Sequence, residues 1–313
     1  MTRPDDWDQT TYLPTMAHRT CSTTPLEGST PNYSAMPQTI PTQIRHNDAM
    51  SESVDQRLTS GLQVFEFPCN ERVRTMLRLE CLSLRYKMLE QQDCSASHEA
   101  ALATLFELYD LLANRSDIKN ELLQELERQR QQLSKFEGLP DVSSDRLRAV
   151  IGEISDIFAA LGDVRLRLGS HLNELEFLMA IKGRTGIPAG NCSFDLPALA
   201  VWLKRTAADR RLALQEWLGP LRPLLGAVEL GLKLLRQGAS PAGYAAQNGS
   251  FELGLSGQQI RLIRIETRDA RELVCDVSSN KYVVAVRFRQ LDQALKLHPI
   301  SGSTDFELTL CDF

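Results

Sequence analysis

A chain of 313 residues, of which 42% are hydrophobic, is long enough for two domains with packed cores. The net charge of −5 excludes a general affinity for nucleic acid or anionic membranes, so any basic surface has to be local. The sequence contains no run of 18 apolar residues and no signal-peptide pattern, and we therefore expect a cytoplasmic protein without a membrane span.

Residues 1–60 differ in composition from the rest of the chain. They hold six of the fourteen prolines, are rich in Ser and Thr, and show no helical or strand period. Such a stretch buries too little apolar surface to offset its ordering entropy, which predicts a disordered N-terminal extension. Two origins stay open, a genuine tail and an upstream start that precedes the true one at Met50.

A short β-like stretch, 61–69, precedes a long helical region over 70–237. Asn70 is the predicted N-cap of the first helix, and Ser95 or Ser97, Ser116 and Ser144 open the next three. The helix that Ser116 opens carries an apolar stripe at steps of three and four residues, and it stops at Gly138 and Pro140. A further helix is expected near 163–182, and Gly219 with Pro220 separates the last two. Long helices with short links favour a bundle.

In the last part of the chain, 238–313, apolar residues recur at every second position, as in β-strands. In residues 281–289 the alternation places Tyr282, Val284, Val286 and Phe288 on one face, and Lys281, Arg287 and Arg289 on the other. Residues 260–265, 273–277 and 306–310 read as further strands, and the 61–69 strand is expected to join them. The predicted fold class is α+β: a helical bundle domain plus a small, mainly antiparallel sheet.

Residues 190–203, GNCSFDLPALAVWL, raise the question of catalysis, because Cys192 and Ser193 follow a glycine. The segment also fits a helix start, with Asp195 as N-cap and Phe194 and Leu199 as a hydrophobic staple. A nucleophile needs a base and an orienting group, and the segment supplies neither. The seven cysteines and five histidines of the chain are scattered, with no CxxC pair and no HExxH motif. We expect no enzyme, no metal and no cofactor.

Four separated segments, in order, resemble the ZapD family of FtsZ-associated cell division proteins. They are FEFPCNERVRTMLRLE at 65–80, ELLQELERQ at 121–129, IPAGNCSFDLP at 187–197 with Trp202-Leu203, and DFEL at 305–308. The resemblance covers roughly 62–313. It implies a non-enzymatic homodimer that binds the C-terminal tail of FtsZ and cross-links FtsZ filaments into bundles at the mid-cell division septum.

The resemblance also implies a basic tail-binding surface where the helical and β domains meet. Its expected residues here are Arg74, Arg78, Arg115 and Arg287. A further family arginine is replaced by Val283, and Lys281 or Arg289 is the expected substitute.

Two alternatives from other classes stay open. The basic sheet could bind nucleic acid, although Tyr282 and Phe288 are expected to face the core, where they could not stack on bases. A hydrolase with Cys192 as nucleophile is the other alternative, which a reactive low-pKa thiol would support.

Overall fold

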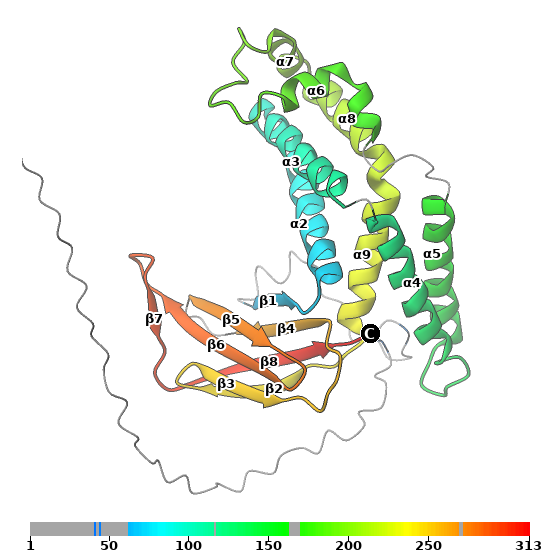
Figure 1. Ribbon diagram of the computed structural model, residues 1–313, viewed down its shortest axis with the longest axis vertical. Helices are drawn as coiled ribbons and strands as arrows, with labels where there is room; N and C mark the ends of the chain where they lie inside the picture. Colours follow the sequence, from blue (N-terminus) through cyan, green and yellow to red (C-terminus); the bar gives the residue numbers. More distant parts are fainter. Residues whose placement is uncertain (1–40, 42–43, 45–61, 116, 163–169, 269–271) are drawn as a thin grey trace, which may run out of the picture. The chain divides into compact units, whose positions relative to one another are not determined.

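The computed structural model describes residues 41, 44, 62–115, 117–162, 170–268 and 272–313 (Figure 1). The predicted disordered extension therefore lies outside the described residues, except at Pro41 and Ile44. Both of these residues are buried. Among the described residues, the helices lie between residues 71 and 237, and every strand except the one at 63–68 follows them, as the α+β prediction requires.

The helices follow one another with short connections, as in a bundle. Their bounds are α2 Glu71–Gln91, α3 Ser95–Ala113, α4 Ile118–Ser134, α5 Ser144–Gly162, α6 Glu176–Lys182, α7 Pro197–Leu203, α8 Ala207–Leu218 and α9 Arg222–Gln237. Two 3₁₀ turns, η2 Ser170–Glu174 and η3 Gly219–Leu221, link them. The stretch predicted as one helix near 163–182 is thus a 3₁₀ turn followed by the short α6, in the part that the structure describes.

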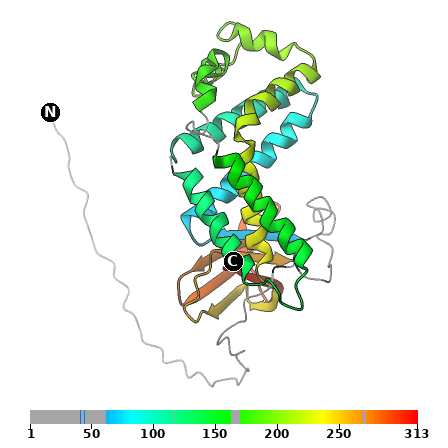
Figure 2. The same cartoon turned by 90° about the vertical axis from the view of Figure 1, so that its right-hand side faces the viewer.

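Helix α9 is the centre of the helical core, because it packs against α2, α4 and α5 (Figure 2). Six of its nine buried residues are leucines. Gly231 lets α2 approach closely: a Cβ at this position would lie 2.8 Å from the terminal methyl of Met76. The Nε2 of Gln129 in α4 donates to the Gly231 carbonyl at 3.0 Å, so α4 also contacts α9 at this residue.

Local sequence signals place several helix ends. The Asn70 side chain accepts a hydrogen bond from the Val73 N–H at 2.8 Å, which confirms the predicted N-cap of α2. Thr206 caps α8 in the same way through the Asp209 N–H. Helix α5 begins at Ser144, and Gly219 with Pro220 separates α8 from α9, both as predicted.

The strands form one eight-stranded sheet whose described pairings are antiparallel (Figure 1). Their bounds are β1 Gln63–Pro68, β2 Ala242–Gln247, β3 Ser250–Gly254, β4 Leu262–Thr267, β5 Leu273–Ser279, β6 Val283–Leu291, β7 Leu297–Pro299 and β8 Ser303–Cys311. The order is β1-β4-β8-β2-β3-β6-β5, with β7 beside β6. Strand β1 pairs with β4, as expected of the strand before the helices.

The β2–β3 hairpin was not predicted, although its signal is present. Asn248 and Gly249 both have positive φ, 51° and 73°, and Gln247 pairs with Ser250 across the turn. An Asn-Gly dipeptide between two strands is the usual sequence of such a two-residue turn. Gly249 has a second constraint, because a Cβ there would lie 2.5 Å from the Phe288 carbonyl oxygen.

The 190–203 segment forms a helix, but Asp195 does not cap it. Helix α7 starts at Pro197 with Leu196 as N-cap and no capping side chain. The Asp195 carboxylate instead pairs with the Arg184 guanidinium at 2.8 Å. Phe194 is 83% exposed, so the proposed staple with Leu199 is also wrong. Leu199 and Trp202 are buried as predicted, and Trp202 stacks near Phe177 and Trp217.

One guanidinium ties the helices to the sheet. Arg236, in the last turn of α9, donates to Glu66 of β1 at 2.8 and 2.7 Å, and to Glu80 of α2 at 2.7 and 2.6 Å. Burial by itself would lower the pKa of Arg236, but the hydrogen bonds and charges of Glu80 and Glu66 raise it well above its ordinary value. The arginine therefore stays charged and binds both carboxylates at once.

Candidate functional site at the helix–sheet junction

A buried carboxylate forms ion pairs with three arginines where the helices meet the sheet. Glu125 of α4 has a side chain that is only 1% exposed. It pairs with Arg72 of α2 at 3.4 Å, with Arg128 of α4 at 2.8 Å, and with Arg261, which directly precedes β4. Gln129 adds a hydrogen bond of 3.1 Å. Three separate chain segments are thus held by one side chain.

This Glu125 cluster keeps a net positive charge. Burial would raise the pKa of the Glu125 carboxyl, but the hydrogen bonds and charges of Arg128 and Arg261 lower it below its ordinary value. The carboxylate is therefore ionised at neutral pH, and it compensates one of three guanidinium charges. The pKa of Arg261 is lowered, mainly by burial, with Glu125 acting in the opposite direction. An anion that approaches this junction meets uncompensated positive charge.

A polar cavity of about 680 Å³ opens at the same place. Among its lining residues, Arg128, Arg261 and Lys281 are cationic, and Asp312 is the acidic one. The remaining lining residues are mostly polar: Cys69, Asn70, Gln132, Leu255, Gln258, Gln259, Ile260, Ser279 and Asn280. The Cys69 sulfur lies 3.6 Å from the Ser279 hydroxyl oxygen, so the end of β1 and the end of β5 meet at the cavity. We refer to it as the junction cavity.

Arg74 and Arg115 are brought together by a shared carboxylate. Glu71, in the first turn of α2, pairs with Arg74 at 2.7 Å and with Arg115 at 3.4 Å. Arg115, between α3 and α4, also pairs with Glu121 at 3.0 Å. Arg78 lies one turn after Arg74, is exposed, and forms no ion pair with any residue that the structure describes.

Arg287 and Arg289 project from β6. Arg287 is exposed and has no ionic partner among the described residues, although Asp276 lies opposite it in the register with β5. Arg289 is engaged, because its guanidinium pairs with Asp276. The buried side of β6 is formed by Val284, Val286 and Phe288, as the alternation predicts.

The predicted strand is wrong at its first two residues, Lys281 and Tyr282. Tyr282 lies before β6 and is 63% exposed, so it does not belong to the core face. The Lys281 ammonium lies 4.7 Å from the centre of the Tyr282 ring. The physical reason is that β6 begins only at Val283, which pairs with Gly254, while Asn280 accepts hydrogen bonds from the Tyr282 and Val283 amides in a turn.

Comparisons with known proteins decide the family. The family model described as ZapD, cell division protein, matches residues 77–287.

The chain belongs to the ZapD family of cell division proteins.

Two relatives show how far the likeness extends. Cell division protein ZapD of Janthinobacterium sp. (strain Marseille) is 40% identical over 250 residues, which are 80% of this chain and 99% of the relative. Cell division protein ZapD of Dechloromonas aromatica (strain RCB) is 40% identical over 249 residues, 79% of this chain and 98% of the relative. Nearly the whole of each ZapD relative is therefore matched, while a fifth of this chain lies outside the match.

The structure distributes the expected ZapD site residues over three places. Arg74 and Arg115 share Glu71, Lys281 lines the junction cavity, and Arg287 with Arg289 lies along β6. Sequence reasoning missed Arg72, Arg128 and Arg261, which surround Glu125. A signal for them existed, because Glu125 lies on the apolar stripe of α4, three residues after Leu122. A carboxylate at a buried helix position predicts cationic partners.

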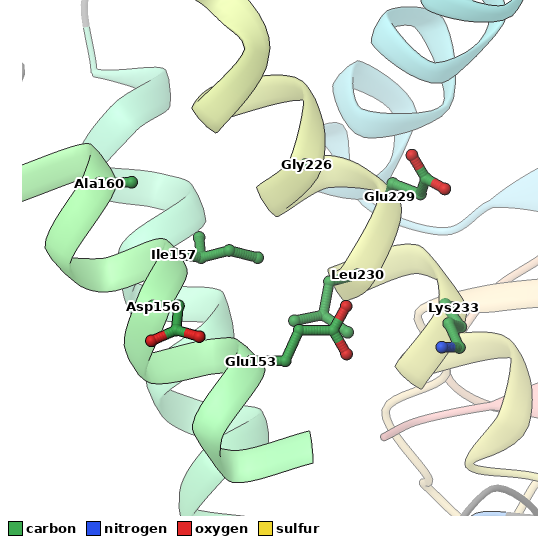
Figure 3. A pocket seen from close by; sticks show the side chains of 8 residues that line it. All are labelled: Glu153, Asp156, Ile157, Ala160, Gly226, Glu229, Leu230 and Lys233. Atoms are coloured by element: carbon green, nitrogen blue, oxygen red, sulfur yellow. The ribbon is translucent and has the colours of Figure 1, made fainter. Parts of the chain in front are cut away.

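A second cavity has the opposite electrostatic character (Figure 3). It lies between α5 and α9 and measures about 450 Å³. Its charged lining residues are Glu153, Asp156 and Glu229 against Lys233, while Ile157 and Leu230 provide apolar surface. Lys87 pairs with Glu229 at 3.6 Å. These carboxylates repel an anionic ligand, so this cavity does not compete with the junction cavity for one.

No catalytic constellation surrounds Cys192 or Ser193 in the described part of the chain. Of the described histidines, His98 bonds to the Glu90 carbonyl and Arg210, His171 to the Trp217 carbonyl, and His298 to Asp292. Within the described residues, no group of His, Cys, Asp or Glu is arranged to hold a metal ion. No helix among them is long and apolar enough to cross a bilayer.

Proposed function

We propose that this chain binds the C-terminal tail of FtsZ at the helix–sheet junction and, as a homodimer, cross-links FtsZ filaments at the mid-cell septum in the cytoplasm. The role is non-enzymatic and uses no cofactor. The observation that supports the proposal is the junction cavity, which is lined by Arg128, Arg261 and Lys281 with Asp312 as its one acidic lining residue, and in which the two arginines share the single carboxylate of Glu125. A cavity of this charge suits a peptide that carries carboxylates.

The ion pairs show which arginines are available to bind a carboxylate of a ligand. Arg78 and Arg287 are exposed and hold no described ionic partner, so they can contact a carboxylate without giving up another interaction. Arg74 and Arg115 have to exchange Glu71, and Arg289 has to exchange Asp276. We therefore assign direct contacts to Arg287, Arg78 and Lys281, and a supporting role to the other three.

The position of Lys281 bears on the family arginine that Val283 replaces. Lys281 lines the junction cavity, whereas Arg289 is occupied with Asp276 further along β6. Val283 itself is partly buried at the start of β6. These placements favour Lys281 as the substitute.

Bundling requires two tail sites in one particle. A homodimer supplies two identical sites, and the second contact to a filament then gains from its high effective concentration. One site per chain is thus sufficient for cross-linking.

The test is co-sedimentation with polymerised FtsZ, together with size-exclusion chromatography. Arg287→Glu replaces an attraction by a repulsion, and losing a charge pair of about 2 kcal/mol raises the dissociation constant roughly thirtyfold. Bundling should therefore disappear while the elution volume stays unchanged. Arg148→Glu is the matched control, because Arg148 is an exposed helical arginine whose only described ionic partner is Asp145. It should bundle normally.

Normal bundling by Arg287→Glu would remove β6 from the proposed site. Absence of any sedimentation with FtsZ by the native chain would refute the proposal as a whole. The exposed Tyr282 beside Lys281 makes nucleic acid the competing ligand to measure, so labelled single-stranded DNA is titrated in parallel. We expect no saturable binding of the DNA at physiological salt.

A further inference from the structure

One residue of the N-terminal extension is part of the helical core. Ile44 is 0% exposed and belongs to the same buried cluster as the leucines of α9. Its N–H donates to the Pro41 carbonyl at 3.0 Å. Its own carbonyl accepts a hydrogen bond from the Ser143 N–H at 2.9 Å. Two independent contacts, one apolar and one polar, therefore hold Ile44 in place.

The polar contact meets a need of helix α5. Ser143 immediately precedes α5; its carbonyl accepts from the Leu147 N–H at 3.0 Å and its hydroxyl from the Arg146 N–H at 3.4 Å. These bonds satisfy donors of the first turn, which have no acceptor within the helix. The N–H of Ser143 itself donates to the Ile44 carbonyl. Ser143 is half-buried, and a backbone N–H that is shielded from water and lacks an acceptor is costly, so the contact stabilises the start of α5.

We propose that Ile44 docks the N-terminal extension onto the helical domain: its carbonyl binds Ser143 in the connection between α4 and α5, and its side chain enters the helical core. Ile44 is then an integral element of the fold. Ile44 lies outside the residues that the family model matches, which begin at residue 77. The docking favours a genuine N-terminal segment over a start at Met50.

The stability test uses the full chain with one substitution. Ile44→Ala removes buried methyl and methylene groups from the core, and we expect the melting temperature to fall by about 4 °C or more. Ile187→Ala is the control, because Ile187 is 47% exposed and its truncation leaves no buried cavity. The control should melt within about 2 °C of the native chain. An unchanged melting temperature of Ile44→Ala would overturn the proposal.

A second readout separates docking from general packing. Amide hydrogen exchange of Ser143 should be slow in the native chain, because Ile44 accepts its N–H. In Ile44→Ala it should accelerate at least about tenfold, while amides in the middle of α9 change only as global stability does. Ile44→Val keeps most of the side chain and should restore protection. If the Ser143 amide of the native chain exchanges as fast as an unprotected amide, Ile44 does not dock there.

Discussion

Truncating Glu125 should destabilise the protein far more than its single negative charge suggests. In the Glu125→Ala chain, Arg72, Arg128 and Arg261 would face one another without the carboxylate that separates them. Removing one partner of a buried ion pair costs about 3–5 kcal/mol, because the remaining charge is buried and uncompensated.

The exposures of the three arginines place the cost within that range. Arg72 and Arg128 have side chains that are 30% and 31% exposed, so water partly solvates them after the change. Arg261 is 15% exposed and loses its one described ionic partner. We therefore expect the lower end, about 3 kcal/mol. For a chain of this size, this corresponds to a melting temperature lower by about 6–12 °C.

The assay is thermal unfolding followed by circular dichroism, with Glu127→Ala as the matched control. Glu127 is on the same helix and pairs with Arg130 at 2.8 Å, but its side chain is 35% exposed. Surface pairs contribute about 0–1 kcal/mol, so the control should lose at most a few degrees. The reasoning fails if Glu125→Ala melts within about 2 °C of the native chain, or if both variants lose the same amount.

Three further outcomes follow from the same contacts. The pKa of Glu125 is lower in the folded protein than in the unfolded chain, so the ionised carboxylate stabilises the fold above the unfolded pKa. This stabilisation is lost as the pH falls through the folded pKa. The urea midpoints of the native chain and Glu125→Gln should therefore converge in acid. Arg236→Met leaves Glu66 and Glu80 facing each other at about one-fifth exposure, and should lower the free energy of unfolding by about 3–5 kcal/mol in urea at pH 7; a loss below 1 kcal/mol would contradict this. Asn70→Ala removes the α2 cap and should cost about 1 kcal/mol in the same assay, against no change if the cap is dispensable.

The elements that sequence predicted are those fixed by local physics. Asn70 next to an apolar run predicts a helix start regardless of the tertiary structure. The alternation of Val284, Val286 and Phe288 likewise predicts a strand. The α+β class follows from the change of period between the two regions. Asp195 shows the limit of this reasoning. Its local sequence fits an N-cap, but a tertiary partner, Arg184, takes the carboxylate instead.

The candidate site was predicted less completely, because it is assembled from distant segments. Glu125 and Arg261 are 136 residues apart in the chain, and only the fold brings them into contact. Tyr282 was placed on the core face because periodicity does not show where a strand starts. The Asn248-Gly249 turn, in contrast, was a local signal that the sequence contained and the prediction overlooked.

The two ionic clusters support the proposal of a tail-binding site at the junction. Arg236 ties β1 to α2 and α9, and Glu125 ties Arg261 beside β4 to α2 and α4, so the walls of the cavity are fixed before any ligand arrives. A peptide that binds there would lose its own conformational freedom, while the protein would lose little, which favours affinity. Because Glu125 compensates one guanidinium of three, the same contacts that make the junction rigid leave it positively charged. Rigidity and charge thus arise from one set of residues, and the exposed arginines of α2 and β6 add to a field that the buried cluster already provides.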